Sequence, residues 1–244
     1  MQIAGIQKCS LVDWPGKVAV VAFAPGCNLD CYFCHNRAIL NPGRCGPFED
    51  ADEFIEWVAE RAGFVDGVVI SGGEPTLQPR LPEFVLALRR RGLAVKLDTN
   101  GTRPGMLAAL LEAGLLDYVA MDIKAPRDRY EAVCGVAVDH AAIDESIRLL
   151  LSDQTHYEFR TTCLPELTED DVVAMAGRIA GARRYVLQQF RPVAAHGSAH
   201  DPRQDAAPHS AEWFVSVMAR IDGLVEHCET RGVDELAFSA FQVA

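Results

Sequence analysis

This 244-residue chain is organised around the stretch Gly26-Cys27-Asn28-Leu29-Asp30-Cys31-Tyr32-Phe33-Cys34-His35-Asn36. It places three cysteines within eight residues, directly after the apolar run Val18–Phe23, which is typical of a strand buried on both faces. Three thiolates this close together on one loop bind an iron–sulfur cluster or a zinc ion. Three ligands also leave one iron of a four-iron cluster without a protein ligand, and an open iron is a position at which chemistry can occur.

Three interpretations of this loop compete. The segment Cys31–His35 matches the C-x-x-C-H signature of c-type haem attachment, but that chemistry accompanies export and leaves Cys27 without a role. A zinc site of the three cysteines and His35 has suitable ligand types, although His35 directly follows Cys34, which makes ligation by both awkward. An iron–sulfur cluster agrees with the number of thiols and with their position after a strand.

Short apolar runs alternate with amphipathic segments along most of the chain. The predicted strands are Val18–Phe23, Val68–Ile70, Val95–Leu97, Tyr118–Met121, Tyr157–Thr161 and Tyr185–Leu187, with a final short strand at Leu236–Phe241. The predicted helices are Asp50–Arg61, Leu81–Arg91, Met106–Ala113, Ala142–Leu151, Asp170–Ile179 and Ala211 to about Cys228. Six β/α units in order favour parallel strands joined by right-handed crossovers. Since a full barrel has eight units, we predict an α/β fold, an incomplete (β/α)6 TIM-like barrel that is open on one side.

No linker or change of composition divides the chain, so we predict a single domain over residues 1–244. Its core covers about residues 15–190. The Pro-, His-, Gly- and Ala-rich stretch Arg191–Pro208 is expected to be a long loop, and with the helix after it forms a C-terminal part, residues 191–244.

Charged and polar residues stand at the ends of the predicted strands. Gly72-Gly73-Glu74 follows the second strand, Asp98-Thr99-Asn100-Gly101 the third, and Asp122-Ile123-Lys124 the fourth, while Arg160 lies in or at the end of the fifth. Because the carboxyl ends of parallel strands lie on one face, we expect these segments and the cysteine loop to converge. Asp98 and Asp122 also suit simple capping roles. Lys124 and Arg160 each need an anionic partner, from the protein or from a ligand.

Composition excludes several classes of protein. The formal net charge of −11 disfavours binding to nucleic acids or to an anionic membrane, and no apolar run approaches the ~18 residues that span a bilayer. The N-terminus lacks the features of a secretory signal, so we expect a cytoplasmic protein in which the eight cysteines do not form a disulfide framework. The cysteines outside the loop are expected to be small core residues or surface thiols: Cys9, Cys45, Cys134, Cys163 and Cys228.

The chain shows a clear resemblance to a known superfamily. The Cys27-x-x-x-Cys31-x-x-Cys34 spacing, with Phe33 before the last cysteine, resembles the signature of radical S-adenosylmethionine (radical SAM) proteins. Gly72-Gly73-Glu74 resembles the methionine-binding motif of that superfamily. The Cys34-His35-Asn36 ending and the loops at Asp98–Gly101 and Asp122–Lys124 are similar to those of glycyl-radical-enzyme activases, the group that includes pyruvate formate-lyase activating enzyme.

Three further segments narrow the resemblance. Ser10–Lys17, Val69–Gln78 and Val119–Pro126 look most like the longer form of the anaerobic ribonucleoside-triphosphate reductase activating proteins. The resemblance covers roughly residues 5–190. It departs at Gln188–Arg191, where the formate-lyase activases have a histidine that this chain lacks; His196 does not align with it.

The resemblance implies a radical SAM core and a role for each matching position. Cys27, Cys31 and Cys34 would ligate a 4Fe-4S cluster whose fourth iron is chelated by S-adenosyl-L-methionine (SAM). The residues implied to bind SAM are Phe33, Gly72, Gly73, Glu74, Asp98, Asp122, Lys124 and Arg160. No side chain is expected to act as a catalytic acid or base.

The implied activity is that of an oxidoreductase that cleaves SAM reductively and uses the 5′-deoxyadenosyl radical to form a glycyl radical on anaerobic ribonucleoside-triphosphate reductase. The implied partners are this glycyl radical enzyme and an electron donor such as flavodoxin or ferredoxin. Activation of another glycyl radical enzyme, of the pyruvate formate-lyase type, is an alternative. A radical enzyme acting on a small molecule, or a non-catalytic iron–sulfur or zinc protein in electron transfer or binding, are further alternatives.

Overall fold

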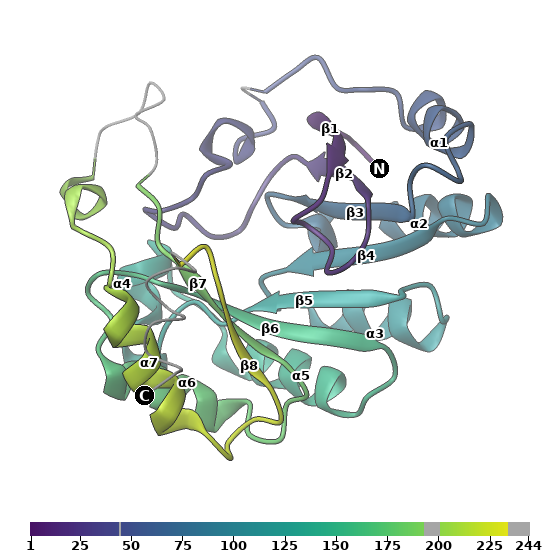
Figure 1. Cartoon of the computed structure of the whole chain (residues 1–244). Coiled ribbons are helices and arrows are strands. Elements are labelled where there is room, and N and C mark those ends of the chain that lie inside the picture. The colour runs from purple at the N-terminus through teal and green to yellow at the C-terminus, as the bar shows by residue number, and fades with distance from the viewer. Residues whose placement is uncertain (44, 193–200, 234–244) are drawn as a thin grey trace. The chain divides into compact units, whose positions relative to one another are not determined.

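The computed structural model describes residues 1–43, 45–192 and 201–233, whose elements are traced in Figure 1. The chain forms two compact units, each assembled from separate segments. The first unit contains Met1–Asp30, Asn36–Ala120 and Ala141–His156, and the second contains Cys31–His35, Met121–His140 and the chain from Tyr157 onward.

The first unit is built on parallel strands with one antiparallel strand added. β2 (Ala19–Ala24), β3 (Gly67–Gly72) and β4 (Ala94–Thr99) are parallel neighbours, and β1 (Gly5–Ser10) pairs antiparallel with β2. Both faces of β2 and β3 are apolar and buried, as expected for central parallel strands. Trp14 packs against Ala19, Val21 and Val69 of this sheet.

Helices of the first unit follow from amphipathic sequences with defined starts. The Asp50 carboxylate caps α1 (Ala51–Ala59) by accepting hydrogen bonds from two backbone amides of its first turn. A proline lies in the first turn of both α2 (Leu81–Arg90) and α3 (Pro104–Glu112), where no amide hydrogen is needed. The remaining helix of this unit is α5, which spans His140–Leu151.

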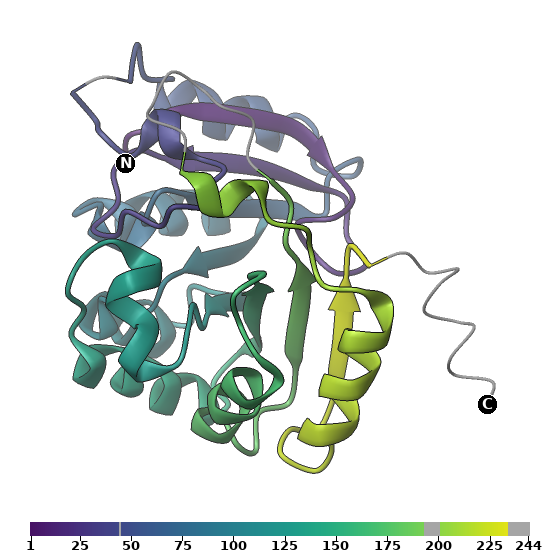
Figure 2. The same cartoon turned by 90° about the vertical axis from the view of Figure 1, so that its left-hand side faces the viewer.

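The second unit repeats the same alternation. β6 (His156–Cys163), β7 (Tyr185–Gln189) and β8 (Cys228–Arg231) are parallel neighbours. Its helices are α4 (Tyr130–Cys134), α6 (Glu169–Arg178) and α7 (Ala211–Ile221), and α7 runs beside β8 in Figure 2. β5 (Tyr118–Asp122) has its first three residues in one unit and its last two in the other. The 3-10 turns are η1 (Arg37–Ile39), η2 (Pro75–Leu77), η3 (Arg127–Arg129) and η4 (Pro202–Asp205).

The strands and helices predicted over residues 18–221 are all present, which confirms the predicted β/α order. The prediction for the last helix was wrong at its end, because α7 stops at Ile221 and Cys228 lies in a strand. Gly223, with φ of +78°, turns the chain there in a conformation that favours glycine. β8 and α4 were not predicted, since each is short, and β1 was not predicted because it lacks an apolar run. The predicted strand Leu236–Phe241 lies outside the described residues.

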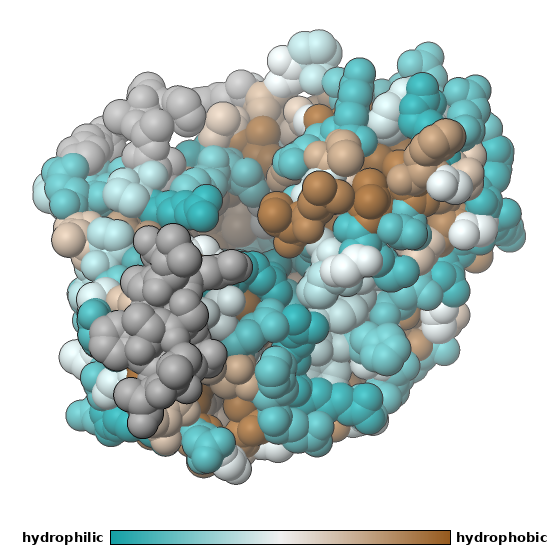
Figure 3. All heavy atoms as spheres, viewed as in Figure 1, coloured by the Kyte–Doolittle hydropathy of each residue, from teal (hydrophilic) through white to brown (hydrophobic). Residues whose placement is uncertain are grey.

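Hydrophilic residues cover most of the face drawn in Figure 3, with apolar residues gathered in a smaller area. Over the described ranges, the large apolar side chains that are exposed are Leu11, Val12, Phe64 and Leu86. None of the helices described is long and apolar enough to cross a membrane.

Candidate active site

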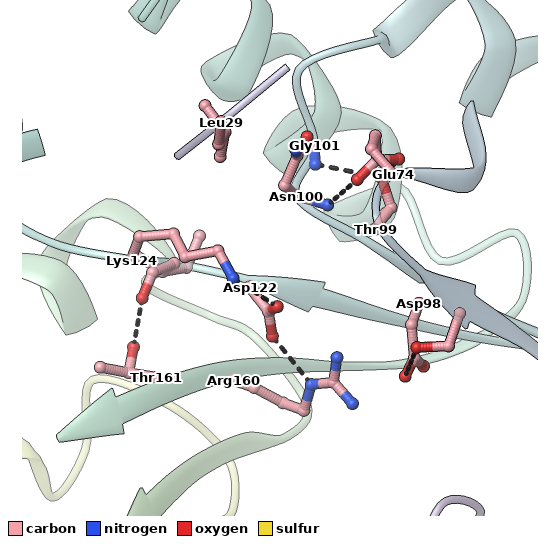
Figure 4. A network of polar contacts seen from close by, with 12 residues as sticks. Leu29, Glu74, Asp98, Thr99, Asn100, Gly101, Asp122, Lys124, Arg160 and Thr161 are labelled. Atoms are coloured by element: carbon pink, nitrogen blue, oxygen red, sulfur yellow. Dashed lines mark hydrogen bonds and ion pairs between the residues drawn. The ribbon is translucent and has the colours of Figure 1, made fainter. Parts of the chain in front are cut away.

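Glu74 is the centre of a buried polar network in the first unit (Figure 4). It follows β3 and caps η2, where its Oε1 accepts hydrogen bonds from the Thr76 amide (3.2 Å) and from the Thr76 hydroxyl. The Thr99 hydroxyl also donates to Oε1 (2.7 Å), and the Asn100 amide donates to Oε2 (2.7 Å). Burial raises the pKa of Glu74, while these hydrogen bonds favour its ionised form. Glu74 thus ties the end of β3 to the end of β4.

The two glycines before Glu74 allow this turn to lie directly on the backbone that leads into the cysteine loop. The Gly73 amide donates to Ala24 O (2.8 Å), and the Glu74 amide donates to Gly26 O (2.7 Å). A Cβ on Gly73 would lie 2.0 Å from Gly26 O, and Gly72 has φ of +118°. Only glycine satisfies both conditions without displacing the chain.

Cys27 receives two N–H groups at its sulfur. The Leu29 amide lies 3.4 Å from Cys27 Sγ, and the Asn100 side-chain amide lies 3.8 Å from it. The same Asn100 amide donates to Asn28 Oδ1 (3.1 Å), which fixes its orientation. N–H groups directed at a thiolate sulfur stabilise its negative charge and tune the potential of a bound iron–sulfur cluster.

Cys31 and Cys34 lie in the second unit, on a tight turn in which the Cys34 amide donates to Cys31 O (3.1 Å). Cys31 is buried and Cys34 half-buried. A hydrogen bond from the Cys134 thiol lowers the pKa of Cys31 to about 7, against the effect of burial and with help from the nearby Lys124 ammonium. This thiol is therefore close to ionisation at neutral pH, as a metal ligand requires.

Asp122 lies between two cations in the second unit (Figure 4). Its Oδ2 is 2.8 Å from Lys124 Nζ, and its Oδ1 is 2.9 Å from Arg160 Nε. Burial alone would raise the pKa of Asp122, but Arg160 and Lys124 outweigh it and lower the pKa to about 2. Burial opposes the charge of Lys124, yet Asp122 holds its pKa well above the usual value. The expectation that Lys124 and Arg160 need an anionic partner is confirmed.

Phe33 lies near Lys124 in the second unit. The Lys124 ammonium is 5.8 Å from the Phe33 ring centroid, within the range of a cation–π interaction. Phe33 also meets the ring of Tyr32 edge-on, with centroids 5.4 Å apart. Phe33 and Tyr32 are both buried.

Asp98 belongs to the first unit and forms an ion pair with Lys96, whose side chain is fully buried. Ser71 Oγ donates to Asp98 Oδ2 (3.2 Å). Sequence reasoning missed Lys96, although a lysine in the middle of an apolar strand, two residues before an aspartate, is a signal of such a pair. It also missed Asn100 as a contact of Cys27 and Cys134 as a contact of Cys31.

The structure brings together several predicted residues within each unit. In the first, Gly72, Gly73 and Glu74 contact the segment before Cys27; in the second, Asp122 joins Lys124 and Arg160, and Phe33 lies near Lys124. Among the described residues, no three His, Cys, Asp or Glu side chains are already grouped as a metal site. The donor set nevertheless fits an iron–sulfur cluster, because its thiols are soft ligands, one receives N–H groups and another has a lowered pKa.

Comparison with known families decides the class of the chain. The model of the radical SAM superfamily matches residues 21–179, which include the cysteine loop and all the site residues discussed above. The chain belongs to the radical SAM superfamily. Radical SAM proteins bind a 4Fe-4S cluster and SAM, so this chain is an enzyme with those two cofactors.

Relatives place the radical SAM chain in the glycyl-radical-enzyme activase family. A protein of Methanocaldococcus jannaschii that is named as a glycyl-radical enzyme activating enzyme is 34% identical over 197 residues, which cover 78% of this chain and 80% of the relative. The pyruvate formate-lyase-activating enzyme of Clostridium pasteurianum is 29% identical over 199 residues, which cover 78% of this chain and 81% of that enzyme.

A solved structure has a similar fold. Streptococcus suis SuiB, bound to its precursor peptide SuiA, matches 91% of this chain and 50% of its own with a TM-score of 0.67, at 11% sequence identity. The predicted fold class, an incomplete TIM-like barrel with parallel strands, is confirmed by the β/α order and by these similarities.

Proposed function

We propose that this radical SAM enzyme activates anaerobic ribonucleoside-triphosphate reductase by forming a glycyl radical on it. The contact of the Gly72–Glu74 turn with the backbone before Cys27 carries the proposal, because it joins the two motifs of the superfamily in one hydrogen-bonded network. The segments Ser10–Lys17, Val69–Gln78 and Val119–Pro126 support the choice of this reductase.

The proposed roles follow the chemistry of each group. Cys27, Cys31 and Cys34 hold the 4Fe-4S cluster, and Gly72, Gly73 and Glu74 receive the methionine amino group of SAM. The other groups proposed to contact SAM are Phe33, Asp98, Asp122, Lys124 and Arg160. Held by these residues, the cluster and SAM would supply the one-electron chemistry that removes a hydrogen atom from a glycine of the partner.

The group formed by Asp122, Lys124 and Arg160 also suits a zwitterionic ligand. Asp122 neutralises part of the charge of Lys124 and Arg160, so the two cations are kept in place before an anionic group arrives. A carboxylate brought to Arg160 would then add a charge-assisted hydrogen bond at little cost in side-chain ordering. We propose that Arg160 partners the methionine carboxylate.

A second candidate is activation of a pyruvate formate-lyase type enzyme, which the similarity to the Clostridium pasteurianum activase favours. In either case a flavodoxin or ferredoxin is the proposed electron donor, and the proposed location is the cytoplasm.

Anaerobic reconstitution with iron and sulfide tests the cofactor assignment. The wild-type chain is expected to show the absorption and EPR spectra of a 4Fe-4S cluster and to cleave SAM when reduced. Cys31→Ala is expected to lose both properties. Cys163→Ala is the matched control, since Cys163 is also a buried thiol but lies in β6. A normal cluster in Cys31→Ala would refute the assignment.

The choice of partner is tested separately. The reduced enzyme and SAM are incubated with anaerobic ribonucleotide reductase or with pyruvate formate-lyase, and the glycyl radical is measured by EPR. A radical on the reductase alone is expected. A radical on the lyase alone would transfer the assignment to the second candidate.

A further inference from the structure

Tyr32 lies between Cys31 and Cys34 in the sequence and is held by three separate contacts. Its side chain is buried, with 4% of the residue's surface exposed. The phenolic OH donates to Glu166 Oε2 (2.7 Å), the ring lies under a guanidinium, and the backbone carbonyl accepts a side-chain hydrogen bond. Phe33 and the cysteines are described by the superfamily signature, but Tyr32 occupies one of its unspecified positions.

Two of the three contacts come from η4, far along the chain. Gln204 is 7% exposed, and its side-chain amide donates to Tyr32 O. The Arg203 guanidinium lies 3.9 Å from the centroid of the Tyr32 ring, which is a close cation–π contact. One short turn therefore holds both the backbone and the side chain of Tyr32.

The groups that contact Tyr32 are themselves fixed. Arg203 donates to Ala132 O (2.9 Å) and pairs with Asp201, the residue that caps η4. Arg129 donates to Glu166 O (3.0 Å), which fixes the backbone of the residue that accepts the hydrogen bond from the Tyr32 hydroxyl. The Gln204 backbone amide donates to Asp201 O (2.9 Å), so each contact ends on a residue with hydrogen bonds of its own.

We propose that Glu166, Arg203 and Gln204 form a clasp on Tyr32 that positions the Cys31–Cys34 turn for cluster binding. The three are positioning residues, since they act through Tyr32. The clasp matters because ligand geometry and access of solvent determine the stability and potential of a cluster. The proposal rests on the proposed function, because that function requires the cluster. The effect of the clasp on the Cys31–Cys34 turn does not require a bound cluster.

The first experiment uses the full chain without iron and measures the rate at which iodoacetamide alkylates Cys31, by mass spectrometry under native conditions. Gln204→Met keeps the volume and removes the donor, and Tyr32→Phe keeps the ring and removes the hydroxyl. Loss of a hydrogen bond to a buried group is expected to raise the alkylation rate of Cys31 about tenfold. Arg220→Ala is the matched control, since Arg220 also pairs with acidic residues but contacts α6.

The second experiment uses reconstituted protein and measures iron release to a chelator and the midpoint potential of the cluster. Both variants are expected to release iron faster and to shift the potential, and Arg220→Ala is expected to match wild type. Equal alkylation rates in wild type, Gln204→Met and Tyr32→Phe would overturn the clasp. Faster alkylation in the variants, with no cluster in wild type, would support the clasp and refute the proposed function.

Discussion

Asp122 shows how one carboxylate can set the charge of its surroundings. It is partly shielded from solvent and pairs with two cations, so its folded-state pKa of about 2 lies below the ordinary value of 3.8. A depressed pKa means that the folded state binds the proton less readily than the unfolded state. The ion pairs of Asp122 with Lys124 and Arg160 therefore stabilise the fold above about pH 4, and this contribution disappears as the pH falls through about 2.

Asp122→Asn is expected to lower the free energy of unfolding at pH 7 by about 3 kcal/mol, since Lys124 and Arg160 lose their shared partner. Between pH 4 and pH 2, the variant is also expected to lose about 2 kcal/mol less stability than the wild type, because it lacks the Asp122 carboxyl group. Urea unfolding at a series of pH values measures both effects. Asp170→Asn, at an exposed ion pair of α6, is the control and is expected to change stability by less than about 1 kcal/mol. An unchanged pH dependence in Asp122→Asn would contradict the argument.

Single residues also show what the sequence can and cannot reveal. A lysine and an arginine at strand ends predicted an anionic partner, because a buried cation needs one. The sequence could not show that Glu74 already accepts hydrogen bonds from Thr76, Thr99 and Asn100, because those contacts depend on how two strand ends approach each other. The contact of Cys134 with Cys31 was missed for the same reason.

Among the elements, the turn between β3 and η2 depends most on the lack of a side chain. Gly73→Ala would place a Cβ 2.0 Å from Gly26 O and break the hydrogen bonds that hold this turn on the chain before Cys27. We expect it to lower the free energy of unfolding by about 2–3 kcal/mol and to reduce the iron bound after reconstitution. Denaturant unfolding and iron analysis measure the two effects.

Gly105→Ala serves as the control for this element. Gly105 lies inside α3, and a Cβ added to it would meet nothing within 4 Å. The substitution is expected to leave iron binding unchanged and to raise stability by about 0.5–1 kcal/mol, because alanine favours the helix. Equal iron loading in Gly73→Ala and Gly105→Ala would show that the close approach is not needed for the site.

Element prediction succeeded where the apolar pattern was clear and failed where an element was very short or lacked such a pattern. β2 and β3 were predicted from continuous apolar runs, and α1 from its acidic first turn. α4 has only five residues and β8 only four, so each contains too few repeats of its pattern to be recognised in the sequence. β1 was missed because Gln7, Lys8 and Cys9 are exposed polar or small residues at the edge.

For the whole molecule, the path of the chain bears on how it unfolds. The boundaries of the two units lie at residues 30/31, 35/36, 120/121, 140/141 and 156/157, and one of them divides β5. Residues 31–35 and 121–140 are therefore joined at both ends to the other unit. The single domain predicted over residues 1–244 stays a prediction, which the unfolding of the two units can test.

We expect both units to unfold in one cooperative transition. Pulse-labelling hydrogen exchange at increasing urea concentrations measures this directly, because peptides report on each unit separately. Peptides from β2 and β3 are expected to lose protection at the same urea concentration as peptides from β6 and β7, with midpoints equal within error. Loss of protection in one set well before the other would instead indicate two domains.

The edge strand β1 has a consequence for the behaviour of the protein in concentrated solution. Among the described strands, β1 is the first in the order and pairs with β2 alone. The register of this pairing shifts along β1 between residues Gln7 and Ser10. An irregular edge that carries the exposed charge of Lys8 is a poor template for a strand from another molecule, so it guards against aggregation. The same edge exposes the thiol of Cys9. Air-oxidised preparations are therefore expected to contain dimers linked through Cys9 rather than strand-paired fibres, and a reductant should disperse them.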